Sequence, residues 1–339
     1  MGSRTFSETD GDIMDIAYLL ALQNLRQALP HAVEQFFGAL SFIGEGPLLV
    51  AAALIVYWCV DKRTGLFALF AMGMGNLVNQ LIKNTACIYR PWIRDAAIVP
   101  SSYAIDGATG YSFPSGHTCA TTSVMGSFAW EARGGKHRGF VAFCIVFILL
   151  MGFSRNFLGV HTPQDVLVGL AVGIAAIAGA QAFFAMIDRA GRTRPGHRRD
   201  VAAVVIIWVV CAAQLAFVML KPYPYDFVDG VLLVDPLVMQ KGSFQATGIL
   251  CGLSLGWLLE RRFVGFSTEG LALRVRVMRG VVGAIVAVAF LLVARLALAP
   301  VLAADPLSLA EMLSCTFGSV FVAPVVFVRI EARRSRQLA

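Results

Sequence analysis

The residues best suited to chemistry fall in three short polar clusters that interrupt otherwise apolar sequence. The clusters read KNTACIYRP at 83–91, PSGH at 114–117 and SRNFLGVHTPQD at 154–165. Together they supply three cations, two histidines and one carboxylate. Fixed cations suit an anionic ligand, and arginine in particular matches phosphate oxygens with two parallel hydrogen bonds. This set of residue types predicts a site for a tetrahedral dianion.

The anion-binding part of the predicted site comes from all three clusters. Lys83, Arg90 and Arg155 provide positive charge. Ser115 and Gly116 begin a predicted helix, where backbone N–H groups and the helix dipole favour an anion. Because glycine has no Cβ, Gly116 lets a ligand approach the backbone closely.

The reactive part of the predicted site is a pair of histidines. His161 and Asp165 are four residues apart, and the intervening Thr162-Pro163 suits a helix start with Thr162 as N-cap. Asp165 would then accept the ring N–H of His161 and fix its tautomer. His117 would be free to protonate a leaving oxygen. No metal site is predicted, because two histidines and one carboxylate are few ligands and the cations would repel a metal ion.

The composition shows which kind of protein must position these residues. Charged residues make up 14% of the 339 residues and hydrophobic residues 58%, whereas a soluble domain has about 25% charged residues. Such a chain cannot cover its apolar surface in water, and the same numbers exclude disorder. The sequence therefore predicts an all-α, polytopic transmembrane helical bundle that uses lipid as its solvent.

Runs of about 20 apolar residues predict nine membrane spans. They are expected at 41–60, 65–83, 116–130, 139–157, 163–187, 201–220, 244–260, 280–298 and 307–328. If 13–29 also spans, the count is ten; we favour helices lying at the membrane interface for this stretch. The predicted domains are interfacial helices at 1–40, a core at 41–188 and a four-helix extension at 189–339.

The cations predict how the chain is oriented. Nineteen of the 28 fall in loops on one face of the nine-span arrangement, which the positive-inside rule makes cytoplasmic. They are Lys62, Arg63, Arg133, Lys136, Arg138, Arg189, Arg192, Arg194, Arg198, Arg199, Arg261, Arg262, Arg274, Arg276, Arg279, Arg329, Arg333, Arg334 and Arg336. Because these cations form no single patch, the net charge of +7 does not predict a nucleic-acid partner. The three polar clusters are expected on the extracytoplasmic face, and the C-terminus in the cytoplasm of a cell-membrane protein.

The clusters resemble the three-part signature of the type 2 phosphatidic acid phosphatase (PAP2) superfamily. The matching patterns are Lys-x6-Arg-Pro, Pro-Ser-Gly-His and Ser-Arg-x5-His-x3-Asp, and the similarity covers about 41–187. The resemblance implies that His161 forms a phosphohistidine, Asp165 orients it and His117 protonates the leaving alcohol. It implies that Lys83, Arg90, Arg155, Ser115 and Gly116 hold the phosphoryl oxygens, with no metal or other cofactor. A chain with nine spans and its N-terminus outside looks more similar to the glucose-6-phosphatase and sphingosine-1-phosphate phosphatase branch than to the six-span lipid phosphatases.

The expected activity is that of a phosphoric monoester hydrolase with a lipid substrate. A polyprenyl phosphate or pyrophosphate, phosphatidic acid, phosphatidylglycerol phosphate or a sphingoid phosphate would fit, and other membrane lipids would surround the spans. Two alternatives stay open, namely a phosphotransferase that uses the same phosphohistidine and a transporter that only binds a phosphate head group. The sequence also leaves open a homo-oligomer. The long segment 221–242 on the predicted catalytic face is either a lid or an interfacial segment without a catalytic part.

Overall fold

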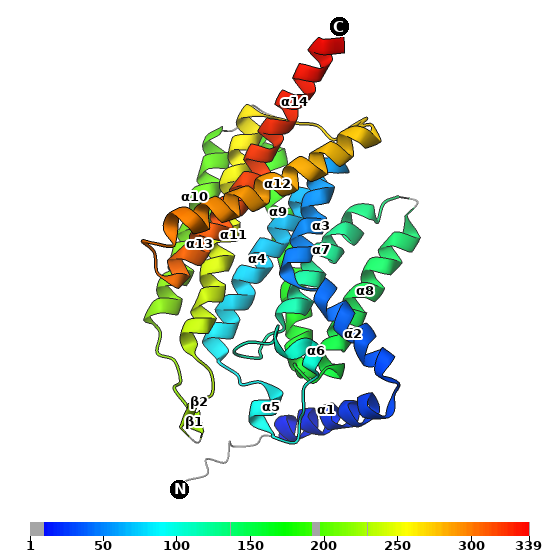
Figure 1. The fold of residues 1–339 in the computed structure, drawn as a ribbon, viewed down its shortest axis with the longest axis vertical. Helices are drawn as coiled ribbons and strands as arrows, with labels where there is room; N and C mark the ends of the chain where they lie inside the picture. The colour runs from blue at the N-terminus through cyan, green and yellow to red at the C-terminus, as the bar shows by residue number, and fades with distance from the viewer. Residues whose placement is uncertain (1–9, 136, 192–196, 229, 339) are drawn as a thin grey trace. The chain divides into compact units, whose positions relative to one another are not determined.

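The computed structural model describes residues 10–135, 137–191, 197–228 and 230–338, and the regular structure within them is almost entirely helical (Figure 1). Their one sheet is an antiparallel hairpin of β1 (Phe227–Val228) and β2 (Val231–Leu232). The helices are α1 (Asp10–Ala28), α2 (His31–Ile43), α3 (Gly46–Cys59), α4 (Lys62–Ala86), α5 (Pro91–Arg94), α6 (Ser102–Ile105), α7 (Gly116–Ala132), α8 (Arg138–Phe157), α9 (Pro163–Gly191), α10 (His197–Leu220), α11 (Pro236–Phe263), α12 (Leu273–Leu298), α13 (Ala304–Phe317), a π-helical turn (Gly318–Val322) and α14 (Ala323–Leu338). The predicted all-α class is confirmed. Lys136, Arg192 and Arg194, three of the cations behind the predicted orientation, lie outside the described residues.

The described residues contain seven helical segments long and apolar enough to cross a membrane. They are Lys62–Arg94, Arg138–Phe157, Pro163–Asp188, Arg198–Leu220, Pro236–Phe263, Leu273–Leu298 and Ala304–Arg333. An eighth span results if α2 and α3, which are bent by 57° at a short break, are counted together. The predicted count of nine is not confirmed. Its remaining member, α7, has only 17 residues, fewer than the roughly 20 that a span needs.

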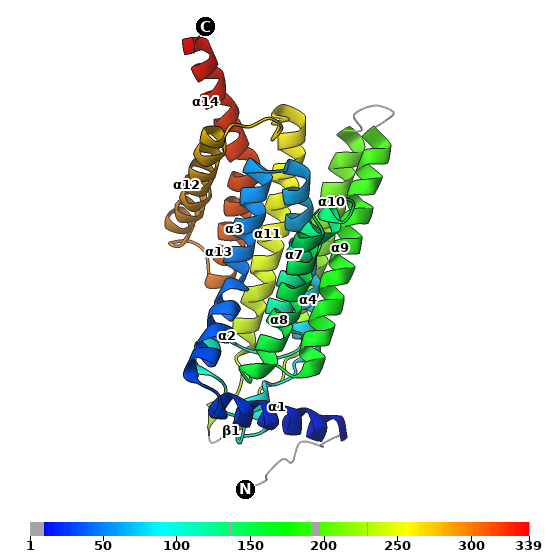
Figure 2. The same ribbon diagram turned by 90° about the vertical axis from the view of Figure 1, so that its right-hand side faces the viewer.

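The N-terminal helix α1 is not among these candidate spans, and it lies crosswise to α8 (Figures 1 and 2). The buried Arg26 ties it to two other segments. Its guanidinium donates to the Phe157 carbonyl at the end of α8 (3.1 Å) and to the Val99 carbonyl (2.6 Å). Gln23 also holds the second segment, since its side chain accepts from the Val99 N–H at 2.7 Å. The interfacial placement of residues 1–40 stays a prediction.

Contacts along the chain divide it into two compact units. The first comprises Met1–Leu49, Val78–Ala175 and Pro222–Met239, and the second Val50–Leu77, Ala176–Lys221 and Gln240–Ala339. Each unit therefore combines segments that are far apart in the sequence. The three consecutive domains expected from the sequence stay a prediction.

In the first unit, two glycines one turn apart let α9 pack closely on α7. A Cβ at Gly169 would lie 2.6 Å from the Ser115 carbonyl oxygen, and a Cβ at Gly173 would lie 2.6 Å from Thr122 Cβ. Any larger residue would push the helices apart, as at other small-residue interfaces between membrane helices. The close packing brings the first residues of both helices together, and the Ser115 N–H donates to the Asp165 carbonyl at 2.9 Å.

In the second unit, α3 is fixed to the π-helical turn between α13 and α14. Backbone carbonyls inside a π-helix pair with the fifth residue ahead, and here two of them also accept from side chains. Tyr57 Oη donates to the Val320 carbonyl and Trp58 Nε1 to the Ser319 carbonyl, both at 2.9 Å. In the same unit the buried Arg279 makes a bidentate pair with Glu331 at 2.8 and 3.0 Å.

We expect Arg26→Met to destabilise the protein by about 1–3 kcal/mol, because the buried Phe157 carbonyl and the partly buried Val99 carbonyl lose a charged donor. The measurement is the unfolding transition of the purified protein in detergent. Arg138→Met is the matched control, since Arg138 is exposed. Equal stability of the two variants would show that α1 is not held through Arg26.

Candidate active site

The start of α9 is built by a reciprocal pair of hydrogen bonds. The Thr162 N–H donates to Asp165 Oδ2 at 2.9 Å, and the Asp165 N–H donates to Thr162 Oγ1 at 3.3 Å. This is a capping box, with Pro163 in the first helical position. It directs the Asp165 carboxylate back toward His161, whose Nδ1 lies 3.1 Å from Asp165 Oδ2. Both side chains are only 2% exposed.

A third group on the same carboxylate is Ser112, which the sequence reasoning missed. Ser112 Oγ donates to Asp165 Oδ2 at 2.5 Å and lies 3.4 Å from His161 Nδ1. The Ser112 N–H donates to the Ile88 carbonyl at 2.7 Å, which fixes this segment beside the first cluster. Since an isolated serine carries no pattern that predicts such a role, only its position two residues before PSGH could have drawn attention to it.

Arg90 connects the first cluster to the histidine. Its Nη1 donates to His161 Nε2 and to the Val160 carbonyl, both at 2.9 Å. Its Nε and Nη2 donate to the carbonyls of Gly110 and Thr109, both at 3.1 Å. Because an arginine nitrogen can only donate, His161 Nε2 must accept. The hydrogen bonds therefore assign the ring proton to Nδ1, where it is donated to the carboxylate.

His161 lies between α8 and α9, outside the candidate spans, and it is an electrically neutral base. Burial of the ring, and next the positive charge of Arg90, hold the pKa of His161 well below its ordinary value of about 6.5. The hydrogen bond to Asp165 opposes this effect. A ring that stays unprotonated near neutral pH keeps a lone pair on Nε2, as a nucleophile or base requires.

Two further cations are buried in the first unit. Arg155 is 1% exposed; its Nη1 donates to Ser41 Oγ, while its Nε and Nη2 have no hydrogen-bond partner in the part of the chain that the structure describes. Lys83 is 6% exposed, and its Nζ donates to the Tyr111 carbonyl at 3.1 Å. Neither takes part in an ion pair among the described residues, although Glu45 interacts electrostatically with Arg155 and Asp165 interacts electrostatically with Lys83. Since buried charge is costly without an opposite charge, these donors point to an anion as the missing ligand.

The PSGH cluster forms the start of α7. Ser115 is its N-cap, with Oγ accepting from the Thr118 N–H (3.4 Å) and from Thr118 Oγ1 (3.0 Å). The Ser115 N–H is already used by the Asp165 carbonyl, so it is not a free anion donor as the sequence suggested. Gly116 leaves open space, because a Cβ there would meet only Asn79 Oδ1, at 3.8 Å.

His117 has no hydrogen bond within the described part of the chain, and the structure shows no direct contact between it and His161. It is close enough to Arg155, His161 and Arg90 to interact with them electrostatically. A Cβ at Gly107 would lie 3.9 Å from His117 Cε1 and 3.7 Å from Glu45 Oε1, so the glycine leaves room beside the ring. All eight predicted site residues thus lie in the first unit.

Residues of the 221–242 segment contact neighbours of the site cations. Tyr223 Oη donates to Asn84 Oδ1 at 2.9 Å, next to Lys83. Tyr89, which precedes Arg90, donates to Asp226 Oδ2 at 2.7 Å. The segment therefore packs against the first cluster. Its roles as a lid and as an interfacial segment both stay predictions.

Among the described residues, no group of three or more His, Cys, Asp or Glu side chains is arranged to hold a metal ion. The metal-independent chemistry expected from the sequence stays a prediction.

Two family models match separate parts of the chain. The model described as "PAP2 superfamily" matches residues 64–191, which include the three polar clusters. The model described as "PAP2 superfamily phosphatase, transmembrane extension" matches residues 244–335. The chain belongs to the PAP2 superfamily. It is a multi-pass membrane protein, and the second match lies within its expected C-terminal extension.

Two curated relatives are similar to this PAP2 chain over less than half of its length. Lipid phosphate phosphatase delta of Arabidopsis thaliana is 25% identical over 154 residues, which are 42% of this chain and 36% of the relative. Phosphatidylglycerophosphatase B of Bacillus subtilis (strain 168) is 29% identical over 145 residues, 40% of this chain and 65% of the relative. The chain thus spans less than two thirds of either relative. No solved structure matches it.

Replacing Arg90 tests the electrostatics of this PAP2 site. In Arg90→Gln the pKa of His161 should rise, because a nearby positive charge is lost, yet remain below the ordinary value because the ring stays buried. Arg90→Lys should keep the pKa low. The measurement is an NMR titration of the histidine ring signals, with the exposed His31 and His137 as internal references.

The control is Arg94→Gln, which removes the same charge from α5 and leaves the hydrogen bond between Arg90 and His161 in place. A His161 pKa that is the same in Arg90→Gln and in the unaltered protein would contradict the assigned contact.

Proposed function

We propose that this protein is a metal-independent membrane phosphatase that hydrolyses a lipid phosphomonoester or pyrophosphate through a phosphohistidine on His161. The observation that carries the proposal is a neutral, buried histidine with Nδ1 held by Asp165 and Nε2 facing an arginine. Two more buried cations without ion pairs lie in the same unit. Membership of the PAP2 superfamily and the lipid phosphatase names of both relatives support it.

In the first step His161 Nε2 attacks phosphorus, and the bond from phosphorus to the leaving oxygen breaks. The Arg90 guanidinium, which donates to Nε2 in the structure, would turn its hydrogen bond to a phosphoryl oxygen and free the lone pair. Burial and the neighbouring cations lower the pKa of His117, and the negative charge of a bound phosphate would offset those cations. A protonated His117 then gives its proton to the leaving alcohol. Asp165, supported by Ser112, stabilises the positive charge that develops on the His161 ring.

In the second step water attacks the phosphohistidine and the phosphorus–nitrogen bond breaks. His117, now neutral, takes a proton from the water, which restores its starting form and releases inorganic phosphate. His161 leaves as a neutral ring with its proton still on Nδ1. Covalent catalysis of this kind divides one difficult displacement into two easier ones.

The phosphoryl oxygens would be held by Lys83, Arg90, Arg155, Ser115 and Gly116. Arg155 suits this role because two of its guanidinium nitrogens are buried and unpartnered, while Lys83 adds an ammonium. The Ser115 N–H already donates to the Asp165 carbonyl, so it cannot bind the phosphate. The Ser115 hydroxyl and the backbone N–H groups that follow it would contact the phosphoryl oxygens instead. Phosphomonoester hydrolysis needs acceleration of up to roughly 10²¹, and clustered cations around a loose transition state supply much of it.

The substrate class is inferred from the surroundings. The expected candidates remain polyprenyl phosphate or pyrophosphate, phosphatidic acid, phosphatidylglycerol phosphate and sphingoid phosphates; the name of the Bacillus relative favours the third. We place the site at the extracytoplasmic leaflet and the C-terminus in the cytoplasm, because the loop cations are concentrated on the other face. The assignment to the glucose-6-phosphatase and sphingosine-1-phosphate phosphatase branch depended on nine spans, so it stays a hypothesis, as does a homo-oligomer.

His161→Ala should lower phosphate release from a lipid phosphate by at least about a thousandfold, because the nucleophile is lost. The measurement is inorganic phosphate released by the purified protein from a panel of lipid and sugar phosphates. His137→Ala, an exposed histidine outside the motifs, is the control and should keep full activity. If His161→Ala kept full activity in an assay of lipid-phosphate flux between leaflets, the transporter alternative would replace the phosphatase. Phosphate transfer that requires an acceptor alcohol would favour the phosphotransferase.

Excess EDTA should leave the turnover unchanged, because the proposed steps use histidines and fixed cations in place of a metal ion. The assay is phosphate release before and after chelation, followed by dialysis. Strong inhibition that an added divalent metal reverses would overturn the metal-independent mechanism.

A further inference from the structure

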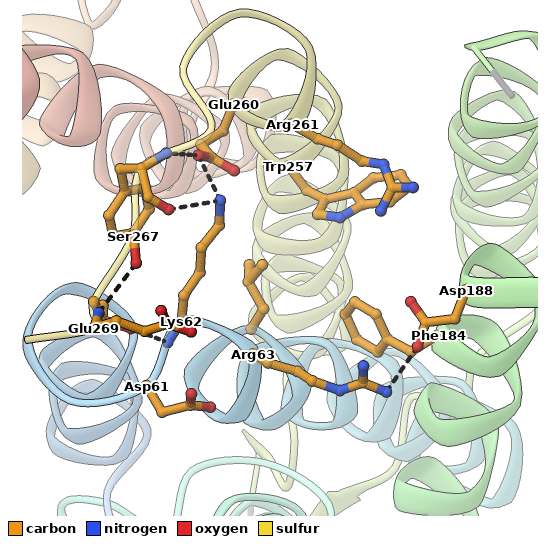
Figure 3. A pocket seen from close by; sticks show the side chains of 13 residues that line it. Asp61, Lys62, Arg63, Phe184, Asp188, Trp257, Glu260, Arg261, Ser267 and Glu269 are labelled. Carbon is orange, nitrogen blue, oxygen red and sulfur yellow. Dashed lines mark hydrogen bonds and ion pairs between the residues drawn. The ribbon is translucent and has the colours of Figure 1, made fainter. Parts of the chain in front are cut away.

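The second unit contains a cavity of about 350 Å³ that the proposed chemistry does not use (Figure 3). It is bordered by the first residues of α4, the last turns of α9 and α11, and the loop that follows α11. Its size lies within the range of small-molecule sites, which combine an apolar lining with a few convergent polar groups. The lining residues are Asp61, Lys62, Arg63, Leu66, Phe184, Asp188, Trp257, Glu260, Arg261, Phe266, Ser267, Thr268 and Glu269.

The three cations of the cavity already have carboxylate partners. Lys62 Nζ lies 2.7 Å from Glu260 Oε1 and Arg63 Nη2 lies 2.8 Å from Asp188 Oδ2, as Figure 3 shows. Arg261 Nε pairs with Asp200 Oδ2 at 3.1 Å. An anionic ligand would have to compete with these carboxylates, so the cavity is poorly suited to one.

The carboxylates of the cavity, in contrast, have unused capacity. Glu260 is 1% exposed, and its Oε1 accepts from Lys62 Nζ (2.7 Å) and from the Phe266 N–H (3.1 Å). Its Oε2 is buried and accepts no hydrogen bond from any residue that the structure describes. The exposed Asp61 and Glu269 also line the cavity and form no ion pair within the described residues. A buried carboxylate oxygen without a donor is costly, which indicates that a donor group is missing from the site.

Aromatic rings also line the cavity. Trp257, Phe266 and Phe184 line the cavity, and the first two already attract cations: Lys62 Nζ lies 4.7 Å from the centre of the Phe266 ring, and the Arg261 guanidinium 5.8 Å from that of Trp257. Ring faces favour positive charge and also accommodate an apolar chain. A ligand that is both cationic and amphiphilic would satisfy the rings and the carboxylates together.

We propose that this cavity binds a primary ammonium group carried by an amphiphile, with the N–H donating to Glu260 Oε2. Asp61 and Glu269 add negative charge at the rim, and the rings of Trp257 and Phe184 cover the attached carbon chain. An aminophospholipid head group and a free organic amine share this chemistry. The site is separate from the proposed phosphatase residues, all of which lie in the first unit.

The test is binding to the full-length purified protein, measured by native mass spectrometry and isothermal titration. The probes are short-chain phosphatidylethanolamine, phosphatidylcholine and phosphatidylglycerol with the same chains, and ethanolamine. Phosphatidylethanolamine should bind best. The choline group of phosphatidylcholine has no N–H donor, and the glycerol group of phosphatidylglycerol has no positive charge. Binding of ethanolamine alone would identify a free amine as the source.

Glu260→Gln should weaken phosphatidylethanolamine binding about tenfold or more, because a charge-assisted hydrogen bond is lost. Glu269→Gln, which breaks no ion pair between described residues, should weaken it less and serves if Glu260→Gln does not fold. Glu311→Gln, a carboxylate of the same unit outside the cavity, and Arg90→Gln, in the proposed phosphatase site, should bind normally. Equal binding of phosphatidylcholine, or full binding by both cavity variants, would overturn the proposal.

Discussion

The hydrogen bonds of Asp165 are the interactions on which the candidate site depends. One carboxylate oxygen receives the His161 ring, the Ser112 hydroxyl and the Thr162 N–H, while the carbonyl of the same residue receives the Ser115 N–H. A single buried residue thereby joins the histidine, the first turn of α9 and the first turn of α7. The join is possible only because Gly169 and Gly173 let these helices touch. Since the oxygen is buried, each lost donor would leave a costly unsatisfied group.

Around this carboxylate, positive charge exceeds negative charge. Lys83, Arg90 and Arg155 are held by carbonyls and hydroxyls, which orient the cations without neutralising them. Such an arrangement is unfavourable by itself in an apolar region and becomes favourable when a dianion enters. The same charge acts on the nucleophile, because Arg90 helps to keep His161 unprotonated. Anion binding and nucleophile activation therefore have one electrostatic cause.

The cavity of the second unit has the opposite electrostatic character. Its cations are neutralised by Glu260, Asp188 and Asp200, and its unused groups are carboxylate oxygens beside aromatic rings. The C-terminal extension had no assigned chemistry from its sequence, because these residues are dispersed over four segments and none forms a motif. In the proposed ammonium site the extension contributes Trp257, Glu260 and Glu269, and it shares the ligand with residues of α4 and α9. Its function then goes beyond supporting the spans.

The sequence by itself determined the helical class, the membrane environment and the superfamily. Apolar runs, scarce charge and three short motifs indicate these properties, because each involves residues that are close together in the sequence. The helix cap at Thr162 is predicted for the same reason. The sequence did not determine the number of spans, because α7 is too short to cross a membrane and the chain bends between α2 and α3. Only the tertiary structure revealed four contacts. Ser112 donates to Asp165, and Arg90 donates to His161 Nε2. The Ser115 N–H donates to the Asp165 carbonyl, and Arg26 donates to the Phe157 carbonyl. Those contacts join residues from different helices and loops, and helix packing, which no local pattern encodes, decides which buried donor meets which acceptor.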